Sequence, residues 1–228
     1  MCYSNSFRRA ASDLLWLIDR KYPRERLLRI VADRYSLSGS ERTMLYRGWF
    51  SGEESRRREK KLLRYSADAD IPLTVDLLNQ LFTVAGYLRG IQVFIATDGW
   101  VRDTMELHGK MIPTGLLKQA AELFTDTVIS NHSGKVVLLV DRQHSQAEEI
   151  VEIFGRMPGW QKENHTVTPV DNVDTILINS AGILATSDTR VIDRAEASVL
   201  DLAAEVLFRS FNPDLPDLRL LMKELKSF

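Results

Sequence analysis

Three apolar segments of this chain each run into an aspartate. Ile71–Val75 leads into Asp76, Lys135–Val140 leads into Asp141, and Ile183–Thr186 leads through Ser187 into Asp188. Short, continuous apolar runs of this kind are typical of strands that are buried on both faces of a parallel sheet. The carboxyl ends of parallel strands meet at one edge of the sheet, where ligands bind in open α/β folds. The sequence therefore predicts several carboxylates along one edge.

The remainder of the chain predicts an α/β fold behind a smaller helical unit. Strand-like and helix-like segments alternate after residue 66, which favours a mainly parallel sheet between helices, a three-layer α/β/α sandwich. Residues 1–65 carry 16 Lys and Arg against 8 Asp and Glu, a balance of +8, whereas the remainder carries 14 against 23, a balance of −9. This shift in charge predicts two domains, a basic helical domain over 1–66 and an α/β domain over 67–228.

The basic domain has apolar residues at helical spacing in three segments, near 11–18, 23–35 and 40–50. Two helices joined by the turn at 36–40 match the outline of a DNA-binding helix-turn-helix, but many simple three-helix units share it, and we favour the simple unit. A basic run follows, made of Arg56, Arg57, Arg58, Lys60 and Lys61, with Arg64 nearby. The run predicts contact with nucleic-acid phosphates, and a solvated linker helix is the alternative.

Five aspartates are candidate functional residues: Asp76, Asp103, Asp141, Asp174 and Asp188. Asn79 and Ser187 are uncharged neighbours of two of them. Hard cations such as Mg²⁺ bind carboxylate oxygens, and a metal held in this way assists phosphodiester hydrolysis. Each aspartate after a strand is also in place to cap the next helix, so capping competes with metal binding as the interpretation of any single one.

Other site classes find little support. The single cysteine, Cys2, excludes a disulfide or a thiolate cluster within one chain, and the glycines match no nucleotide-binding loop. No apolar run reaches the roughly 18 residues of a membrane span, so we expect a cytoplasmic protein without a membrane partner. An oligomer is compatible with the sequence, although no pattern specifies one.

At these same residues the chain resembles an uncharacterised prokaryotic family, domain of unknown function 434, joined to a PIN-like domain. The resemblance rests on motifs in both halves: Val31–Tyr35, Leu37–Arg47, Asp76–Asn79, Asp98–Asp103, His108–Gly109, Asp141–Arg142 and Ala185–Asp193. The sequence departs from the expected pattern at Leu77, which replaces a glycine, and after Asp141, where Arg142–Ser145 lacks the expected proline.

PIN-like domains often cleave RNA, or DNA flaps, with Mg²⁺ or Mn²⁺ held by acids at the edge of the sheet. The resemblance implies that Asp76, Asp174 and Asp188 are metal ligands, with Asp103 and Asp141 assisting. It also implies substrate contacts from Asn79, Arg102, Arg142 and Ser187. We therefore expect a metal-dependent nuclease, with RNA favoured over DNA as its substrate. The alternative is a non-catalytic nucleic-acid-binding protein on a PIN-like scaffold, and a phosphatase is a distant third.

Overall fold

The computed structural model describes residues 3–63, 70–105, 111–160 and 164–226. The chain forms two compact units, and both are discontinuous in sequence. Unit 1 contains residues 1–60, 91–107 and 214–228, and unit 2 contains residues 61–90 and 108–213. The predicted boundary between residues 66 and 67 lies outside the described residues, as do Arg64, His108 and Gly109. The described residues 91–105 and 214–226, which we assigned to the α/β domain, belong to unit 1.

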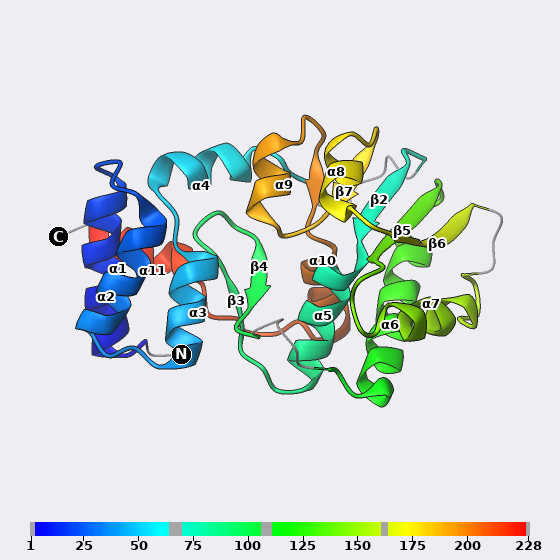
Figure 1. The fold of residues 1–228 in the computed structure, drawn as a ribbon, viewed down its shortest axis with the longest axis horizontal. Helices are drawn as coiled ribbons and strands as arrows, with labels where there is room; N and C mark the ends of the chain where they lie inside the picture. Colours follow the sequence, from blue (N-terminus) through cyan, green and yellow to red (C-terminus); the bar gives the residue numbers. More distant parts are fainter. Residues whose placement is uncertain (1–2, 64–69, 106–110, 161–163, 227–228) are drawn as a thin grey trace. The chain divides into compact units, whose positions relative to one another are not determined.

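Unit 1 is mainly helical (Figure 1). Its elements are α1 (Asn5–Ile18), α2 (Arg24–Arg34), α3 (Gly39–Gly48), α4 (Gly52–Glu59), the strands β3 (Val93–Ile95) and β4 (Val101–Asp103), and α11 (Leu218–Lys226). β3 and β4 form an antiparallel hairpin. Ser38 and Ser51 begin α3 and α4 with capping boxes, in which the serine and a glutamate three residues later satisfy free amides of the first turn.

The core of unit 1 explains why the hairpin and the C-terminal helix belong to it. Phe94 of β3 and Leu218 of α11 are fully buried together with Leu45 and Trp49 at the end of α3. At Gly48, a Cβ atom would lie only 2.5 Å from the ring of Phe94 and 2.6 Å from Leu218. The absence of a side chain at Gly48 therefore lets these three elements approach closely.

Unit 2 is the predicted α/β domain. Its elements are β1 (Leu62–Leu63), β2 (Leu73–Asp76), α5 (Leu77–Leu88), α6 (Thr114–Asn131), β5 (Val136–Asp141), α7 (Ala147–Gly155), β6 (His165–Val170), α8 (Val173–Ile178), β7 (Ile183–Ala185), α9 (Thr189–Arg194), β8 (Val199–Leu200) and α10 (Leu202–Phe211). In the described residues, six parallel strands form one sheet in the order β1-β8-β7-β2-β5-β6. The expectation of a helical N-terminal region followed by an α/β domain with a parallel sheet is confirmed.

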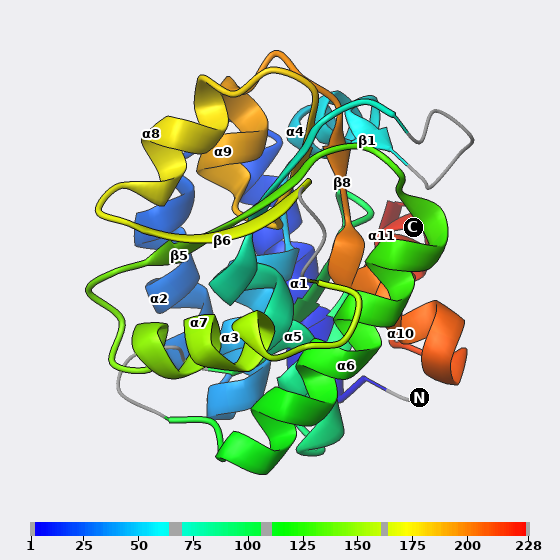
Figure 2. The same cartoon turned by 90° about the vertical axis from the view of Figure 1, so that its right-hand side faces the viewer.

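Helices cover both faces of this sheet. In both views, α5, α6, α7 and α10 lie on one side of the strands, and α8 and α9 lie on the other (Figures 1 and 2). β2 is central, and its residues Leu73 and Val75 are fully buried, as the continuous apolar run predicts. Among the described residues, no helix is both long enough and apolar enough to cross a lipid bilayer.

The order of the strands defines a switch point beside β2. After β2 the chain adds β5 and β6 on one side, and it then returns to place β7 and β8 on the other side. β2 and β7 are direct neighbours, with Val75 paired to Ala185. In open α/β sheets, the crevice outside the carboxyl ends of two such strands is the usual ligand site. The topology therefore predicts a ligand site at Asp76 and at the residues that follow Ala185.

Candidate functional site

Asp76 and Asp188 each begin a helix at this switch point. The Asp76 carboxylate accepts a hydrogen bond from the backbone N–H of Asn79, 3.3 Å away, at the start of α5. The Asp188 carboxylate accepts one from the backbone N–H of Arg190, 2.7 Å away, at the start of α9. Both aspartates are thus helix caps, as the capping interpretation predicts. Capping alone does not explain their electrostatics.

The carboxyl group of Asp76 is in an unfavourable place for a negative charge. Burial, followed by the charges of Asp188 and Asp174, raises its pKa from an ordinary value of 3.8 to about 7, against the lowering effect of its hydrogen bonds with Asn79 and Thr186. Among the described residues, no basic side chain forms an ion pair with Asp76. A buried carboxylate that lacks a cation and has like charges nearby is the kind of group that functional sites contain.

Asp174 and Asp141 belong to the same electrostatic neighbourhood. Asp174 lies in the first turn of α8, and its pKa is raised by burial and then by Asp188, with a smaller contribution from Asp141 at the end of β5. The Asp141 carboxylate accepts a hydrogen bond from the backbone N–H of Gln143, 2.9 Å away. The structure therefore brings together four of the five predicted acids, although Asp141 is the most peripheral member.

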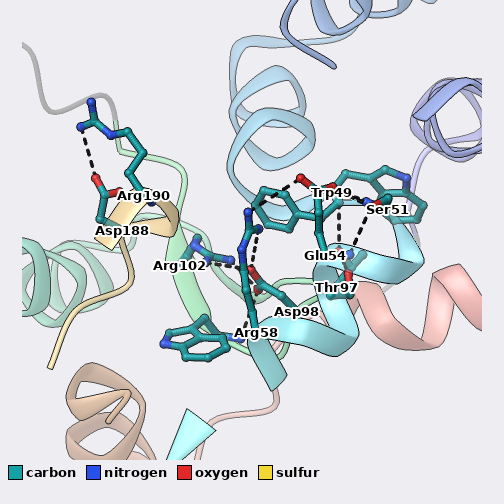
Figure 3. Close-up of polar contacts among 12 residues, drawn as sticks. Trp49, Ser51, Glu54, Arg58, Thr97, Asp98, Arg102, Asp188 and Arg190 are labelled. Carbon is teal, nitrogen blue, oxygen red and sulfur yellow. Dashed lines mark hydrogen bonds and ion pairs between the residues drawn. The ribbon is translucent and has the colours of Figure 1, made fainter. Parts of the chain in front are cut away.

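Arg190 provides positive charge at the outer side of this group. Its guanidinium lies 3.4 Å from the carboxylate of Asp188 (Figure 3). It also lies 3.7 Å from the carboxylate of Asp174, and its side chain is 73% exposed. Exposed pairs at these distances contribute little to stability because water screens them. Arg190 thus partly offsets the acidic charge without burying it.

Three uncharged side chains fix the loop between β7 and α9. The side-chain oxygen of Asn79 accepts hydrogen bonds from the backbone N–H and the hydroxyl of Ser187, at 2.7 and 2.9 Å. The Thr186 hydroxyl donates to Asp76 over 3.3 Å and accepts from the N–H of Asp188 over 3.1 Å. These contacts give Asn79 and Ser187 a positioning role, because they set the distance between the two capping aspartates.

Sequence reasoning missed Thr186, Gln80 and Arg190. Gln80 is fully buried in α5; its amide donates to Asn79 over 2.8 Å, and its oxygen accepts from the N–H of Ala203 over 2.7 Å. A glutamine within the apolar run 77–88 was the available signal. For Thr186, the signal was a hydroxyl at the end of a buried strand, directly before two residues already chosen as candidates.

The structure places Asp103 elsewhere. Asp103 ends β4 in unit 1, is almost fully buried, and accepts hydrogen bonds from the guanidinium of Arg47 and the backbone N–H of Met105, at 2.8 and 2.9 Å. Both charges of this pair are largely removed from solvent, and the contact ties α3 to the hairpin. The resemblance implied that Asp103 assists the site, whereas in the structure it is an ion-pair partner within unit 1.

Two arginines that we predicted to contact nucleic acid are buried in unit 1. Arg102 forms a bidentate pair with Asp98, at 2.7 and 3.0 Å, and Arg58 reaches the same carboxylate at 3.3 Å (Figure 3). Both guanidinium groups also lie over the ring of Phe50. Side chains that are 2–4% exposed have no access to a phosphate in this structure, so we base no contact on them.

The other predicted basic contacts differ in exposure. Arg56, Arg57 and Lys60 are exposed at the end of α4, whereas Arg142 pairs with Asp171 at 3.1 Å on the surface of unit 2. The ammonium of Lys61 donates to the carbonyls of Ile192 and Ala195 at the end of α9, at 2.8 and 2.7 Å. Lys61 thus anchors the helix that Asp188 begins.

A metal centre made only of side chains is not preformed. Within residues 3–63, 70–105, 111–160 and 164–226, no three His, Cys, Asp or Glu side chains are placed to hold one metal ion together. The oxygen donors nevertheless suit Mg²⁺ or Mn²⁺ in type, and Mg²⁺ is commonly held by one or two carboxylates, with waters and substrate phosphates as its other ligands. Asp76 and Asp188, linked through Thr186, are the pair that fits this description.

Two family models match successive parts of the chain. The family model described as Protein of unknown function (DUF434) matches residues 6–61, which confirms the first part of the predicted resemblance. An uncharacterized protein of Methanocaldococcus jannaschii is 26% identical over 204 residues, 89% of this chain and 97% of that protein. No solved structure matches the chain. A second family model matches residues 67–205, more than half of the chain, and the protein therefore belongs to the family described as Domain of unknown function (DUF5616).

Proposed function

We propose that this protein is a metal-dependent nuclease that hydrolyses phosphodiester bonds, with the acids beside β2 and β7 as its active site. The resemblance to PIN-like domains favours RNA over DNA as the substrate. Mg²⁺ or Mn²⁺ is the cofactor in this proposal, and nucleic acid is the partner. A cytoplasmic location and the absence of a membrane partner stay predictions from the sequence.

One observation carries the proposal: Asp76 is a half-buried residue whose carboxyl group has its pKa raised to about 7 by desolvation and by Asp188 and Asp174, and it has no basic ion-pair partner in the described residues. This arrangement costs folding free energy when Asp76 is ionised, because burial and like charges both oppose ionisation. A divalent cation would remove that cost. The position at the switch point of a parallel sheet supports the same interpretation.

The residues divide the work between ligation and positioning. Asp76 and Asp188 would hold the cation, and Asp174 would bind it directly or through a water molecule. Thr186, Asn79 and Ser187 keep the two capping carboxylates in place through the hydrogen bonds described above. When bound, such a cation neutralises charge on the phosphodiester and lowers the pKa of a water molecule. Asp141, which is half-buried at the end of β5, would orient a water molecule.

The test compares three aspartates in one assay. Labelled single-stranded RNA and DNA are incubated with the wild-type protein in Mn²⁺, Mg²⁺ or EDTA. We expect cleavage that requires the metal and that falls by orders of magnitude in Asp76→Asn and Asp188→Asn. Asp171→Asn, an exposed aspartate of the same unit, is the matched control and should cleave normally. Full activity in Asp188→Asn would refute the assignment of the site.

A non-catalytic role is the second candidate, because no three acids of the described residues are placed together for a metal and Arg190 already offsets the charge of two of them. In that case the protein binds nucleic acid in EDTA without cleaving it in any metal. Calorimetric titration of Mn²⁺ separates the two: saturable binding that is lost in Asp76→Asn supports the nuclease, and equal weak binding in both proteins supports the non-catalytic role.

A further inference from the structure

The helical unit exposes aromatic rings at one end of its bundle. Trp16 near the end of α1, Tyr22 in the following turn and Tyr46 near the end of α3 are 56%, 53% and 57% exposed. The other three tryptophans of the chain, Trp49, Trp100 and Trp160, are buried. Large aromatic side chains usually bury their surface in the core or at interfaces, so three exposed rings in one unit indicate a binding surface.

Two of these rings have an arginine beside them. The guanidinium of Arg20 lies 3.8 Å from the centre of the Trp16 ring, and it donates a hydrogen bond to the Trp16 carbonyl over 3.1 Å. The guanidinium of Arg24 lies 5.5 Å from the centre of the Tyr46 ring and donates to the carbonyls of Tyr46 and Trp49. Backbone hydrogen bonds therefore hold both arginines next to their rings.

The same hydrogen bonds bring the three segments to one place. Arg24 is the first residue of α2, and its bonds to Tyr46 and Trp49 join the start of α2 to the end of α3. The turn that carries Tyr22 leads directly from the end of α1 to the start of α2, and the N–H of Tyr22 donates to the carbonyl of Leu17 over 3.3 Å. The ends of α1 and α3 and the start of α2 thus surround this turn.

This end of the unit is also basic. Residues 20–26 contain four basic side chains, those of Arg20, Lys21, Arg24 and Arg26, against one acidic side chain, that of Glu25. The nearby carboxylate of Asp19 is shared with Lys226, 3.5 Å away, and with the backbone N–H of Gly52, 3.2 Å away. The surface thus combines flat rings with positive charge, which suits a ligand that has both flat bases and phosphates.

We propose that Trp16, Arg20, Tyr22, Arg24 and Tyr46, the aromatic–arginine surface, bind single-stranded nucleic acid. Bases stack on exposed aromatic rings without a strict sequence requirement, and the exposed Arg20 contacts an adjacent phosphate, whereas Arg24 holds the start of α2 beside Tyr46. The surface belongs to unit 1, and its binding does not depend on the acids of unit 2 or on cleavage.

The contacts of α3 favour a single strand over a duplex. A recognition helix reads the major groove with side chains that are free to reach base edges. In α3, Arg42 instead donates to the carbonyl of Leu37 and pairs with Asp33 at 2.6 Å, and Arg47 pairs with the buried Asp103. Both arginines of this helix are thus committed to contacts within the unit.

Tryptophan fluorescence provides a direct measurement, because Trp16 is exposed and the other tryptophans are buried. A mixed-sequence single-stranded RNA of about 12 nucleotides is titrated in EDTA into the full chain carrying Asp76→Asn, so that cleavage does not interfere. We expect saturable quenching of the emission. In Trp16→Phe the quenching should disappear, because the exposed tryptophan is gone, while a stacking ring remains. The affinity of each variant for RNA is measured by the fluorescence anisotropy of a labelled RNA. We expect the affinity to fall only a few-fold in Trp16→Phe and about tenfold in Trp16→Ala.

A pair of charge variants separates stacking from general attraction. Arg20→Gln and Arg29→Gln each remove one positive charge from the helical unit, but only Arg20 lies on an aromatic ring; Arg29 is 89% exposed and pairs with Asp33 at 3.9 Å. We expect Arg20→Gln to weaken binding clearly more than Arg29→Gln. The proposal would be overturned if the two charge variants lost equal affinity, or if Trp16→Ala bound RNA as tightly as the Asp76→Asn protein. It would also be overturned if duplex bound more tightly than single strands, or if the Asp76→Asn protein bound no RNA. None of these results would decide whether the acids of unit 2 form a nuclease site.

Discussion

Two aspartates, one in each unit, show opposite ways of treating a desolvated carboxylate. Asp98 in unit 1 has a fully buried side chain and accepts hydrogen bonds from two guanidinium groups, those of Arg102 and Arg58. Asp76 in unit 2 accepts hydrogen bonds, within the described part of the chain, from the N–H of Asn79 and the hydroxyl of Thr186, and its charged neighbours there, Asp174 and Asp188, are acids. The first carboxylate is neutralised within the protein, whereas the second is not.

This difference separates a structural role from a functional one. A buried carboxylate with a bidentate arginine is satisfied, and removing any partner is costly. A carboxylate whose pKa is raised toward neutrality by burial and like charges contributes nothing comparable to folding, which is why such groups cluster at binding sites. Charge density alone does not distinguish the two, because both residues follow β-type segments of the sequence.

The largest effect should come from Asp98→Asn. The substitution leaves two buried guanidinium groups without their shared anion, and we expect a loss of about 3–5 kcal/mol in the free energy of unfolding. Urea denaturation followed by circular dichroism measures it. Asp171→Asn breaks an exposed pair with Arg142 and should cost less than about 1 kcal/mol. Similar small losses in both variants would show that the Asp98 network does not stabilise unit 1.

Asp76→Asn should instead increase the free energy of unfolding. The pKa of Asp76 is raised on folding, so its contribution to stability is fully present below the unfolded value near 3.8 and is lost as pH rises through about 7. The asparagine has no charge to bury and keeps an oxygen for the N–H of Asn79. Since Asp76 retains some accessible surface, we expect a gain of about 1–2 kcal/mol, less than the full shift implies.

Unfolding of both proteins at pH 4 and pH 8 tests this sign. The gain in Asp76→Asn should be present at pH 8 and close to zero at pH 4. Asp171→Asn, with its exposed carboxylate, should follow the wild-type pH dependence. If Asp76→Asn were destabilising at pH 8, the carboxylate would contribute to folding in the manner of Asp98, and the contrast between the two would fail.

The sequence was sufficient for the main architecture and for most of the acids. Continuous apolar runs identified β2 and β5, and the rule that parallel strands end at one edge grouped Asp76, Asp141 and Asp188, whereas Asp174 was chosen from the resemblance to PIN-like domains. The sequence did not reveal that the hairpin β3–β4 packs in unit 1. That placement depends on the contact of Phe94 with Leu218 and on the absence of a side chain at Gly48, and these contacts join residues far apart in the chain.

The sequence also did not show which charged residues, far apart in the chain, form ion pairs in the fold. A run of arginines in the sequence shows charge but not burial, so Arg58 and Arg102 looked like surface contacts until Asp98 was seen between them. For the same reason Asp103 looked like a site acid, although Arg47 holds it in unit 1. Thr186 and Gln80 were missed because a single polar residue within an apolar run carries no signal about its partner.

The smallest effect concerns Arg190, the exposed counterpart of the arginines that neutralise Asp98. Its guanidinium lies near Asp188 and Asp174, where it competes with any cation bound by these carboxylates. Arg190→Gln should therefore bind Mn²⁺ about three- to tenfold more tightly in a calorimetric titration, since one positive charge a few ångströms away is removed. Arg194→Gln is the matched control, because Arg194 also lowers the pKa of Asp174 but forms no ion pair with Asp188 in the described residues. Arg194→Gln should give a smaller increase in Mn²⁺ affinity.

Weaker Mn²⁺ binding in Arg190→Gln would instead show that Arg190 positions the two carboxylates, and an unchanged affinity would place the cation away from them.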